Sequence, residues 1–416
     1  MPRRIGTPGW WETILTPLTV GRVKGGCKAR CKFAYAVAQI APARQDHPRS
    51  RRARPSTEQG GPVTDAPGRP RLADVAAYAG VSTATVSRVL SGKSTVSAET
   101  RQTVLAAADV LGYERPRVSG TRAAGLVGLV VPELTNPIFP AIAQAAEAQL
   151  VKAGYTPLLC AQSPGGTTED EYIETLSEHG ADGIVFVSGL HADSLAGHDR
   201  YRALRERGMP IVLVGGFAPD VDAPQVATDE ATAERLAVRH LVAQGHRHIG
   251  LTLGPERFVP SQRKRAGFVD ALVSAGLAHD VTDAGTHVAS TLYTVEGGQA
   301  AANDLLNSGH TALVCASDLM ALGAMRAVRS RGLRVPDDVS VVGFDDSPLM
   351  AFTEPPLTTV RQPVHVLMRA AVSMLLSEIR GERVTRTELM IEPELVVRGS
   401  TGAAPATPPR IDRGEP

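Results

Sequence analysis

Residues 74–90 read Asp-Val-Ala-Ala-Tyr-Ala-Gly-Val-Ser-Thr-Ala-Thr-Val-Ser-Arg-Val-Leu, and this stretch carries the clearest fold signal in the chain. With the residues just before it, it places apolar side chains at the i, i+3, i+4 and i+7 positions of a helix, namely Leu72, Val75, Ala76 and Ala79. Gly80 ends this helix, because glycine tolerates the left-handed conformation of a C-cap. Ser82 is a suitable N-cap for a second helix through Val89. The stretch predicts two short helices joined by a tight turn.

A third helix is expected directly after them. Ser97 can cap it, and Val104, Ala108 and Leu111 fall on its inner face. Two short helices joined by a glycine turn and braced by a third form a helix-turn-helix. In that motif the second helix enters the major groove of DNA with its first residues at the base edges.

The second helix carries the residue types that such a contact needs. Thr83 and Ala84 have methyl groups that can touch thymine, and Arg88 is long enough for a bidentate contact to guanine. Hydroxyl groups near the helix start suit phosphate oxygens, and they belong to Ser82, Thr85 and Ser87. The plain alternative is an ordinary helical hairpin, in which each of these positions is a solvated surface residue.

Charge is divided unevenly along the 416 residues, although the formal net charge is only +1. Residues 1–69 carry +9, residues 70–122 carry +3, and residues 123–416 carry −11. A basic front on an acidic body indicates a part that binds a polyanion. Residues 1–69 are rich in Arg, Pro and Gly and show no sustained hydrophobic period, so we expect a disordered basic extension.

Composition excludes several other classes of protein. With 43% hydrophobic residues the chain can form cores, and no run of about eighteen apolar residues is available to span a membrane. The apolar run near the N-terminus is broken by Glu12 and two prolines, which argues against secretion and for a cytoplasmic protein. Four cysteines do not make a disulfide framework in a chain of this length. Cys27 and Cys31 have no second ligand pair nearby, so we expect neither a metal site nor a cofactor.

From Leu126 onward, short apolar runs alternate with helical patterns. The runs are Leu126–Val131, Pro157–Cys160, Gly183–Val187, Ile211–Val214, Ile249–Leu253, Ala312–Cys315 and Val339–Val342. The helical patterns include Ile138–Ala153, Glu230–Gln244, Gln262–Ala275, Leu319–Arg331 and Val364–Ile379. Strands that are apolar on both faces are typical of a parallel sheet covered by helices. The chain is therefore expected to be an α/β protein, with an all-α helix-turn-helix domain followed by a doubly wound, parallel-sheet domain of two lobes. Ligands of such sheets bind beyond the C-terminal ends of the strands.

Two sets of longer motifs stand out, one in each part of the chain. The first set is Asp74–Ser82, Thr85–Leu90, Val96–Arg101 and Leu111–Tyr113. The second set includes Asn136–Phe139, Ala266–Phe268, Leu319–Gly323, Val341–Asp346, Pro356–Thr359 and Val397–Ser400. By these motifs, residues 71–402 closely resemble the LacI/GalR family of bacterial transcriptional regulators.

The resemblance implies a homodimer or tetramer that binds a palindromic operator in double-stranded DNA, most simply as a repressor. It also implies that a small effector, sugar-like or nucleoside-like, binds between the two lobes and changes operator affinity. The implied domains are a basic extension at 1–69, a DNA-binding domain at 70–116, a hinge at 117–125, an effector domain at 126–402 and a disordered tail at 403–416.

The hinge departs from the family pattern. Relatives place a Leu from a hinge helix into the minor groove, and no Leu stands at that place here. Gly120 and Gly125 disfavour a helix by about 1 kcal/mol each. Arg115 and Arg117 are the residues that we expect to contact phosphate or a narrow minor groove instead.

Several effector-binding residues are implied by the resemblance. Asp345 matches a family carboxylate that accepts hydrogen bonds from ligand hydroxyls, although a turn Asp is the alternative. Gln362 matches a family residue of the pocket or the hinge. Lys264 occupies the place of a family Arg, between Arg263 and Arg265, and a shift of one residue decides which of the three faces the ligand.

Three further positions complete the expected pocket. Ser317 stands where many relatives have Asn, and it hydrogen-bonds with a shorter reach. Asn136 and Phe139 follow the first strand of the body and are expected to face the cleft from the other lobe.

Two other classes of function compete with a regulator. An enzyme is disfavoured because no Gly-x-Ser-x-Gly elbow occurs, and Gly92-Lys93-Ser94 lacks the first P-loop glycine. An exported solute-binding protein, or a receptor without a DNA function, has a similar two-lobed body but no use for residues 71–113. The sign of regulation, repression or activation, is not encoded in these motifs.

Overall fold

The structure is a computed structural model that describes residues 70–90, 96–113, 125–163 and 165–406. It divides into two compact units at residue 114, which we name the head (residues 70–113) and the body (residues 125–406). The expected basic extension, nearly all of the expected hinge, and residues 407–416 of the expected tail lie outside the described residues.

The head consists of three helices, α1 (Leu72–Tyr78), α2 (Thr83–Leu90) and α3 (Ala98–Val110). Gly80 has φ +65° and ends α1 as expected. The Ser97 hydroxyl accepts a hydrogen bond from the Thr100 amide at 3.2 Å and caps α3. The helices enclose one small apolar core of Val75, Ala76, Val86, Val89, Val104, Ala107 and Ala108. The inner faces predicted from the sequence are therefore confirmed.

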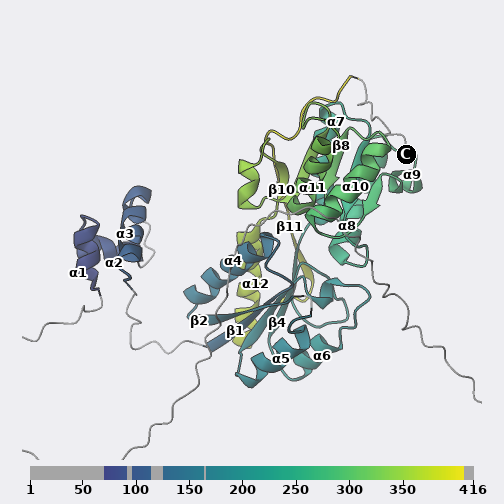
Figure 1. The fold of residues 1–416 in the computed structure, drawn as a ribbon. Coiled ribbons are helices and arrows are strands. Elements are labelled where there is room, and N and C mark those ends of the chain that lie inside the picture. Colours follow the sequence, from purple (N-terminus) through teal and green to yellow (C-terminus); the bar gives the residue numbers. More distant parts are fainter. Residues whose placement is uncertain (1–69, 91–95, 114–124, 164, 407–416) are drawn as a thin grey trace, which may run out of the picture. The chain divides into compact units, whose positions relative to one another are not determined.

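The first lobe of the body is a six-stranded sheet in the order β11-β5-β4-β3-β1-β2, seen in the lower half of the body in Figure 1. Its strands are β1 (Gly125–Val131), β2 (Tyr155–Ala161), β3 (Gly183–Val187), β4 (Ile211–Val214), β5 (Gln225–Thr228) and β11 (Glu388–Ile391). All of them pair in parallel. Its helices are α4 (Ile138–Lys152), α5 (Glu169–Glu178), η1 (Leu190–Ala192), α6 (Asp199–Glu206) and α12 (Val364–Ile379).

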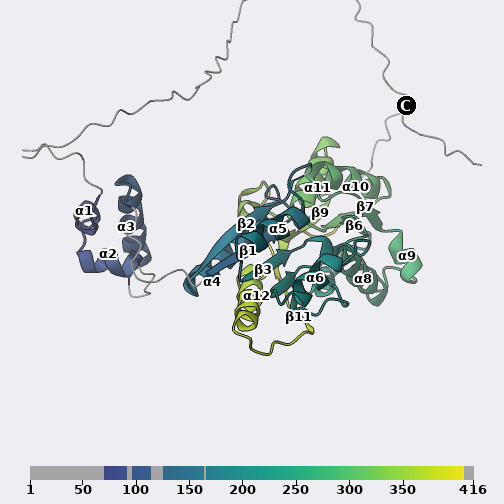
Figure 2. The ribbon, with the colours of Figure 1, turned by 90° about the horizontal axis from the view of Figure 1, so that it is seen from below.

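Both faces of this sheet are buried, as the apolar runs predicted. Val127, Leu129 and Val131 of β1 pack with residues of α4 and α12, whereas Val130 packs on the other side with residues of α5 and α6. Figure 2 shows the two helical layers from below, with α4 and α12 to one side of the sheet and α5 and α6 to the other.

The second lobe is another six-stranded sheet, in the order β12-β10-β9-β8-β6-β7. Its strands are β6 (Ile249–Leu253), β7 (Val288–Ser290), β8 (Ala312–Cys315), β9 (Ser340–Asp345), β10 (Thr358–Arg361) and β12 (Glu394–Val396). Its helices are α7 (Glu230–Ala243), α8 (Val259–Ser274), α9 (Val281–Gly285), α10 (Val295–Asn307), α11 (Asp318–Ser330) and η2 (Pro348–Phe352). β12 pairs antiparallel with β10, so this sheet is not wholly parallel.

The expectation of two doubly wound lobes is confirmed, with one correction to an element that matters for the site. The strand expected at Val339–Val342 begins at Ser340 and continues to Asp345. Asp345 is therefore the last residue of β9. The chain passes between the lobes three times, after Thr228, after Arg361 and after Ile391.

Candidate DNA-reading helix and effector site

Local hydrogen bonds fix the start of α2. The Ser82 hydroxyl accepts a hydrogen bond from the Thr85 amide at 3.2 Å, which caps the helix as predicted. The same hydroxyl lies 2.9 Å from the Thr85 hydroxyl, and Thr85 is half-buried. Thr85 thus takes part in the cap as well as standing near the helix start.

The outer face of α2 is formed by the residues predicted to meet DNA. Val86 and Val89 are buried in the head, and this orientation turns the opposite side of the helix to solvent. The exposed residues on that side are Ser82, Thr83, Ala84, Ser87 and Arg88. Arg115 and Arg117, also predicted to bind DNA, lie outside the described residues.

In the body, Asp345 and Gln362 come together at the junction of the lobes. The Gln362 amide donates a hydrogen bond of 2.7 Å to Oδ1 of Asp345, and its carbonyl oxygen accepts one of 3.1 Å from the Thr228 hydroxyl. Asp345 closes a strand of the second lobe, whereas Thr228 closes a strand of the first. Gln362 follows β10 at a crossing between the lobes. It therefore joins the C-terminal strand ends of both lobes.

Lys264 lies in the interior of the second lobe, close to Asp345. Its ammonium nitrogen is 2.9 Å from the centre of the Phe344 ring and has no hydrogen-bond partner among the described residues. The side chain is only 2% exposed, and burial lowers the pKa of Lys264 while the carboxyls of Glu234, Glu230 and Asp345 oppose that shift. Burial in turn raises the pKa of Glu234 to about 7. Lys264, Glu230, Glu234 and Asp345 thus form a buried cluster of ionisable side chains near the end of β9. Lys264 Nζ and one carboxyl oxygen each of Glu230 and Glu234 have no hydrogen-bond partner among the described residues.

Arg263, one residue earlier, reaches the other lobe, and its guanidinium also lies 3.7 Å from Glu230 of this cluster. Its guanidinium donates two hydrogen bonds to Glu388 of β11, at 2.7 and 2.8 Å, and lies over the ring of Phe217. Asp193 and Arg257 form a second ion pair between the lobes at 3.3 Å. The third candidate, Arg265, is partly exposed and lies 3.7 Å from Glu256. Of the three neighbouring residues, Lys264 is the one that lies with Asp345.

Three predicted pocket residues also have local structural roles. The Ser317 hydroxyl caps α11 by accepting from the Met320 amide at 3.3 Å. Oδ1 of Asn136 accepts from the Ile138 amide at 3.3 Å, where α4 begins. Phe139 is half-buried against the core of the first lobe. Asn136 and Phe139 follow β1 and Ser317 follows β8, so all three stand after the C-terminal ends of strands.

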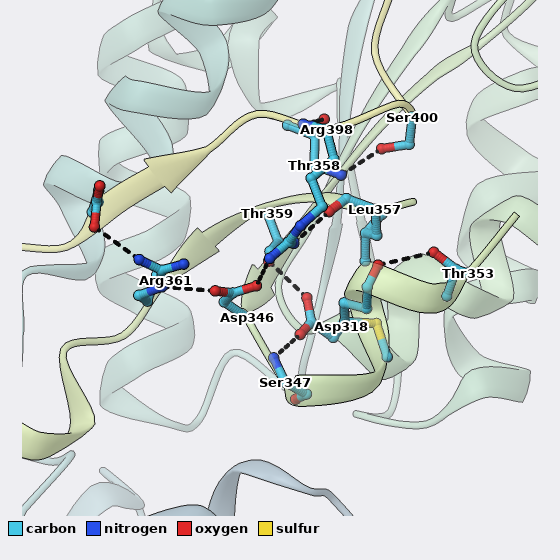
Figure 3. A network of polar contacts seen from close by, with 12 residues as sticks. Asp318, Asp346, Ser347, Thr353, Leu357, Thr358, Thr359, Arg361, Arg398 and Ser400 are labelled. Atoms are coloured by element: carbon cyan, nitrogen blue, oxygen red, sulfur yellow. Dashed lines mark hydrogen bonds and ion pairs between the residues drawn. The ribbon is translucent and has the colours of Figure 1, made fainter. Parts of the chain in front are cut away.

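Sequence reasoning missed Asp318, which lies beside this group. Its two carboxylate oxygens accept hydrogen bonds from the Thr359 hydroxyl and the Ser347 amide, each at 2.7 Å (Figure 3). Burial raises the pKa of Asp318 to about 6. Burial and the nearby Asp318 carboxyl also raise the pKa of Asp345 well above its usual range. The signal was present in the sequence, because Asp318 directly follows Ser317 at the start of a helix.

Across the described ranges, no group of three or more His, Cys, Asp or Glu side chains is arranged to hold a metal ion. No helix in the same ranges is long and apolar enough to cross a membrane.

Comparisons with known proteins now give the family. A model described as bacterial regulatory proteins, lacI family, matches residues 71–116, and one described as a periplasmic binding protein-like domain matches residues 238–401. An HTH-type transcriptional regulator in the aml 5' region of Streptomyces limosus is 60% identical over 82% of this chain and 97% of its own length. The chain belongs to the LacI family.

Other regulators of the family support this assignment along nearly the whole of their lengths. The HTH-type transcriptional regulator MalR of Streptomyces coelicolor is 58% identical, over 83% of this chain and 99% of MalR. The HTH-type transcriptional repressor CytR of Escherichia coli is 34% identical, over 80% of this chain and 97% of CytR. This LacI-family chain is therefore a DNA-binding regulator of transcription, as the motifs predicted. The proteins it resembles are regulators and not enzymes.

Solved structures give the same fold. The transcriptional regulator CelR in complex with cellobiose matches with a TM-score of 0.59 and 34% identity, covering 80% of this chain and all of CelR. The Lac repressor dimer bound to operator and the anti-inducer ONPF matches with a TM-score of 0.57 and 29% identity, covering 81% of this chain and all of that one. The α/β fold class predicted from the sequence is confirmed.

Proposed function

We propose that this LacI-family regulator represses transcription from an inverted-repeat operator, and that a neutral, hydroxyl-rich effector between the two lobes changes its operator affinity. The observation that carries the proposal is the combination of an exposed, capped α2 with a buried, incompletely bonded ammonium group beside Asp345. The first suits readout of DNA bases, and the second suits a polar ligand that completes missing hydrogen bonds.

On the DNA side, the outer face of α2 supplies the proposed contacts. Thr83 and Ala84 meet base edges at the start of the helix, and Arg88 binds a guanine. Ser82, Thr85 and Ser87 are assigned to phosphate oxygens, as are Arg115 and Arg117.

On the effector side, the proposed pocket centres on Asp345, Lys264 and Gln362, with Ser317, Asn136 and Phe139 around them. A carboxyl, an ammonium and an amide side by side match the hydroxyl groups of a sugar, each of which both donates and accepts. The solved relative CelR holds cellobiose, which supports a sugar over a nucleoside. In this proposal Arg263 acts through its ion pair with Glu388, which joins the second lobe to the first.

We propose that the protein works as a homodimer in the cytoplasm, where operator DNA is found. Large apolar side chains are exposed on α4 and on the edge strand β2, at Val151, Leu158 and Leu159. In the second lobe Phe352 is 85% exposed. Exposed apolar patches of this kind mark protein interfaces. A second copy is the proposed occupant, because the operator-bound Lac repressor that this chain resembles is a dimer.

The test begins with selection of duplexes from a random pool by the purified full chain at moderate salt. An inverted repeat should be enriched, and one sugar from a panel of maltose, cellobiose and ribose, with cytidine and adenosine as alternatives, should change operator affinity by about fivefold or more. Asp345→Asn should weaken binding of that effector by about tenfold, as loss of a hydrogen-bond partner in a buried site does, and leave effector-free operator binding unchanged. Asp337→Asn is the matched control, because Asp337 is exposed and pairs only with Arg334 among the interactions described. A chain that binds a sugar but prefers no inverted repeat would instead be a receptor without a DNA function.

A further inference from the structure

The turn after β9 has an unusual backbone. Asp345 has φ +120° and Asp346 has φ +58°, and neither residue is glycine. Positive φ values in residues with a side chain cost on the order of 1–3 kcal/mol each and persist only where the surroundings enforce them. Such strain concentrates at functional sites, and here it lies in the turn that includes Asp345.

Two arginines from distant parts of the chain hold Asp346. Its Oδ2 accepts a hydrogen bond from Nε of Arg361 at 2.7 Å, and its Oδ1 accepts one from Nη2 of Arg398 at 2.5 Å (Figure 3). The Asp346 carboxylate is 8% exposed, and both of its oxygens are occupied. It is therefore poorly placed to serve as a ligand for an effector, in contrast to Asp345.

The arginines are themselves anchored. Nη1 of Arg398 donates to the Leu357 carbonyl at 2.7 Å, and its backbone amide donates to the Thr358 hydroxyl at 2.9 Å. Arg361 also contacts Glu394 of β12 at 3.1 Å. A rigid guanidinium fork with several fixed partners defines the position of a carboxylate more closely than a single bond does.

The residues on either side of Asp346 are fixed by separate bonds. Asp345 accepts from the Gln362 amide, and the Ser347 amide donates to Asp318. Arg361 and Asp345 are also direct partners in the register of β9 and β10. Each residue of the turn is thus held by its own hydrogen bond, and Asp346 is held most firmly because it pairs with two guanidinium groups.

We propose that Asp346 is a positioning residue, which with Arg361 and Arg398 holds the turn in the conformation that aims the Asp345 carboxyl at the effector. This inference rests on the proposed function of Asp345. It predicts that the ion pairs themselves, and not merely tolerance of a positive φ, are required.

The decisive variant is Asp346→Gly, because glycine adopts a positive φ freely but has no carboxylate. Asp346→Gly should raise the effector dissociation constant, measured by calorimetry with cellobiose and maltose as probes, about tenfold. Asp346→Asn also suits the left-handed region but keeps only one acceptor oxygen and no charge, so it should recover only part of the affinity. Operator binding by the effector-free variants should equal that of the wild type, which separates positioning from a general loss of structure. Asp337→Gly, at an exposed aspartate of the same lobe, is the matched control.

A second measurement does not need an effector. Hydrogen–deuterium exchange of the full chain should show about tenfold faster exchange at the amides of Ser347 and Gln362 in Asp346→Gly, and unchanged exchange in β6. Unchanged exchange at these two amides would overturn the inference, whatever the probes do.

The outcomes separate the inference from the function on which it rests. If Asp345→Asn weakens probe binding and Asp346→Gly does not, the proposed pocket stands and the positioning role is overturned. If Asp345→Asn leaves the dissociation constant of every bound probe unchanged, the proposed pocket is wrong and the positioning role falls with it. If neither probe binds the wild type, the exchange measurement decides whether Asp346 holds the turn.

Discussion

The head and the body use polar side chains in opposite ways. In the head, the residues proposed to read DNA are on the surface of α2, and its core is made of seven small apolar side chains among the described residues. In the body, the central residues proposed to bind the effector are buried: Lys264 is 2% exposed, Ser317 is 2% exposed and Asp345 is 5% exposed. The largest apolar cluster of the body surrounds Phe344, which contacts the Lys264 ammonium.

This contrast follows from the ligands. Duplex DNA is too large to be enclosed, so it is recognised by side chains on a projecting face. A small effector is recognised by being enclosed, so the side chains proposed to bind it lie in the interior of the body. Substitution of an outward-facing side chain of α2 such as Arg88 should therefore alter binding without stability, whereas substitutions in the buried site of the body should alter the two together.

The largest effect is expected for the buried carboxyl of Glu234. Its pKa in the folded chain is about 7, above its ordinary value of 4.5, because of burial. The folded chain then holds this proton more tightly than the unfolded chain, so the free energy of unfolding falls as pH rises from 4.5 to about 7. The full loss from this group is on the order of 3 kcal/mol.

Glu234→Gln removes that loss and should flatten the dependence of stability on pH. Urea unfolding of the full chain at pH 5 and pH 8 measures it, and the variant should gain stability relative to the wild type at the higher pH. Glu296→Gln serves as the control, because that carboxylate is 76% exposed. An equal pH dependence in the wild type and Glu234→Gln would mean that the Glu234 carboxylate is not excluded from water in the folded chain. Burial of ionisable side chains would then distinguish the body from the head less clearly.

A smaller effect, on binding alone, is expected for Arg88→Ala. Loss of a bidentate contact to guanine should cost about 1 to 3 kcal/mol of discrimination between the operator and a duplex changed at that base. Because Arg88 is on the exposed side of α2, unfolding of the head and the affinity for effector should not change. Competition titrations with matched and altered duplexes measure the discrimination. Equal discrimination in the wild type and the variant would place another residue at that base.

The two regions also differed in how much the sequence revealed. The three helices of the head were predicted almost to the residue, because each has a local apolar face and α2 and α3 also have a local side-chain cap. In the body the strands β1 to β4, β6, β8 and β9 were predicted, whereas β5, β7, β10, β11 and β12 were not. The motif resemblance gave Asp345. The role of Asp346 was out of reach, since Arg398 lies 52 residues further on and only the folded sheet brings the two together.

Helix α10 shows why local pattern was insufficient in the body. It begins with Gly297 and Gly298 in its first turn, and each glycine disfavours a helix by about 1 kcal/mol. A Cβ added to Gly298 would lie 2.3 Å from the backbone of Met320 in α11. The glycine is needed because the two helices pack closely. Close packing of α10 against α11 thus outweighs the low helix propensity of glycine.

The smallest effect is expected at the start of α1, where stability and DNA binding should move in opposite directions. Arg71 is the N-cap residue, and its backbone amide donates to the Asp74 carboxylate at 2.5 Å, but the guanidinium has no acceptor for the helix amides. Arg71→Thr would supply that acceptor and stabilise the helix by about 0.5–1 kcal/mol. Hydrogen–deuterium exchange of the α1 amides should slow accordingly. If Arg71 also contacts a phosphate, the same variant should bind all duplexes more weakly and lower the salt dependence of binding by about one unit of slope. A variant that is more stable and binds with an unchanged salt dependence would show that Arg71 faces solvent in the complex, and that the head gives up a cap there without a gain in DNA binding.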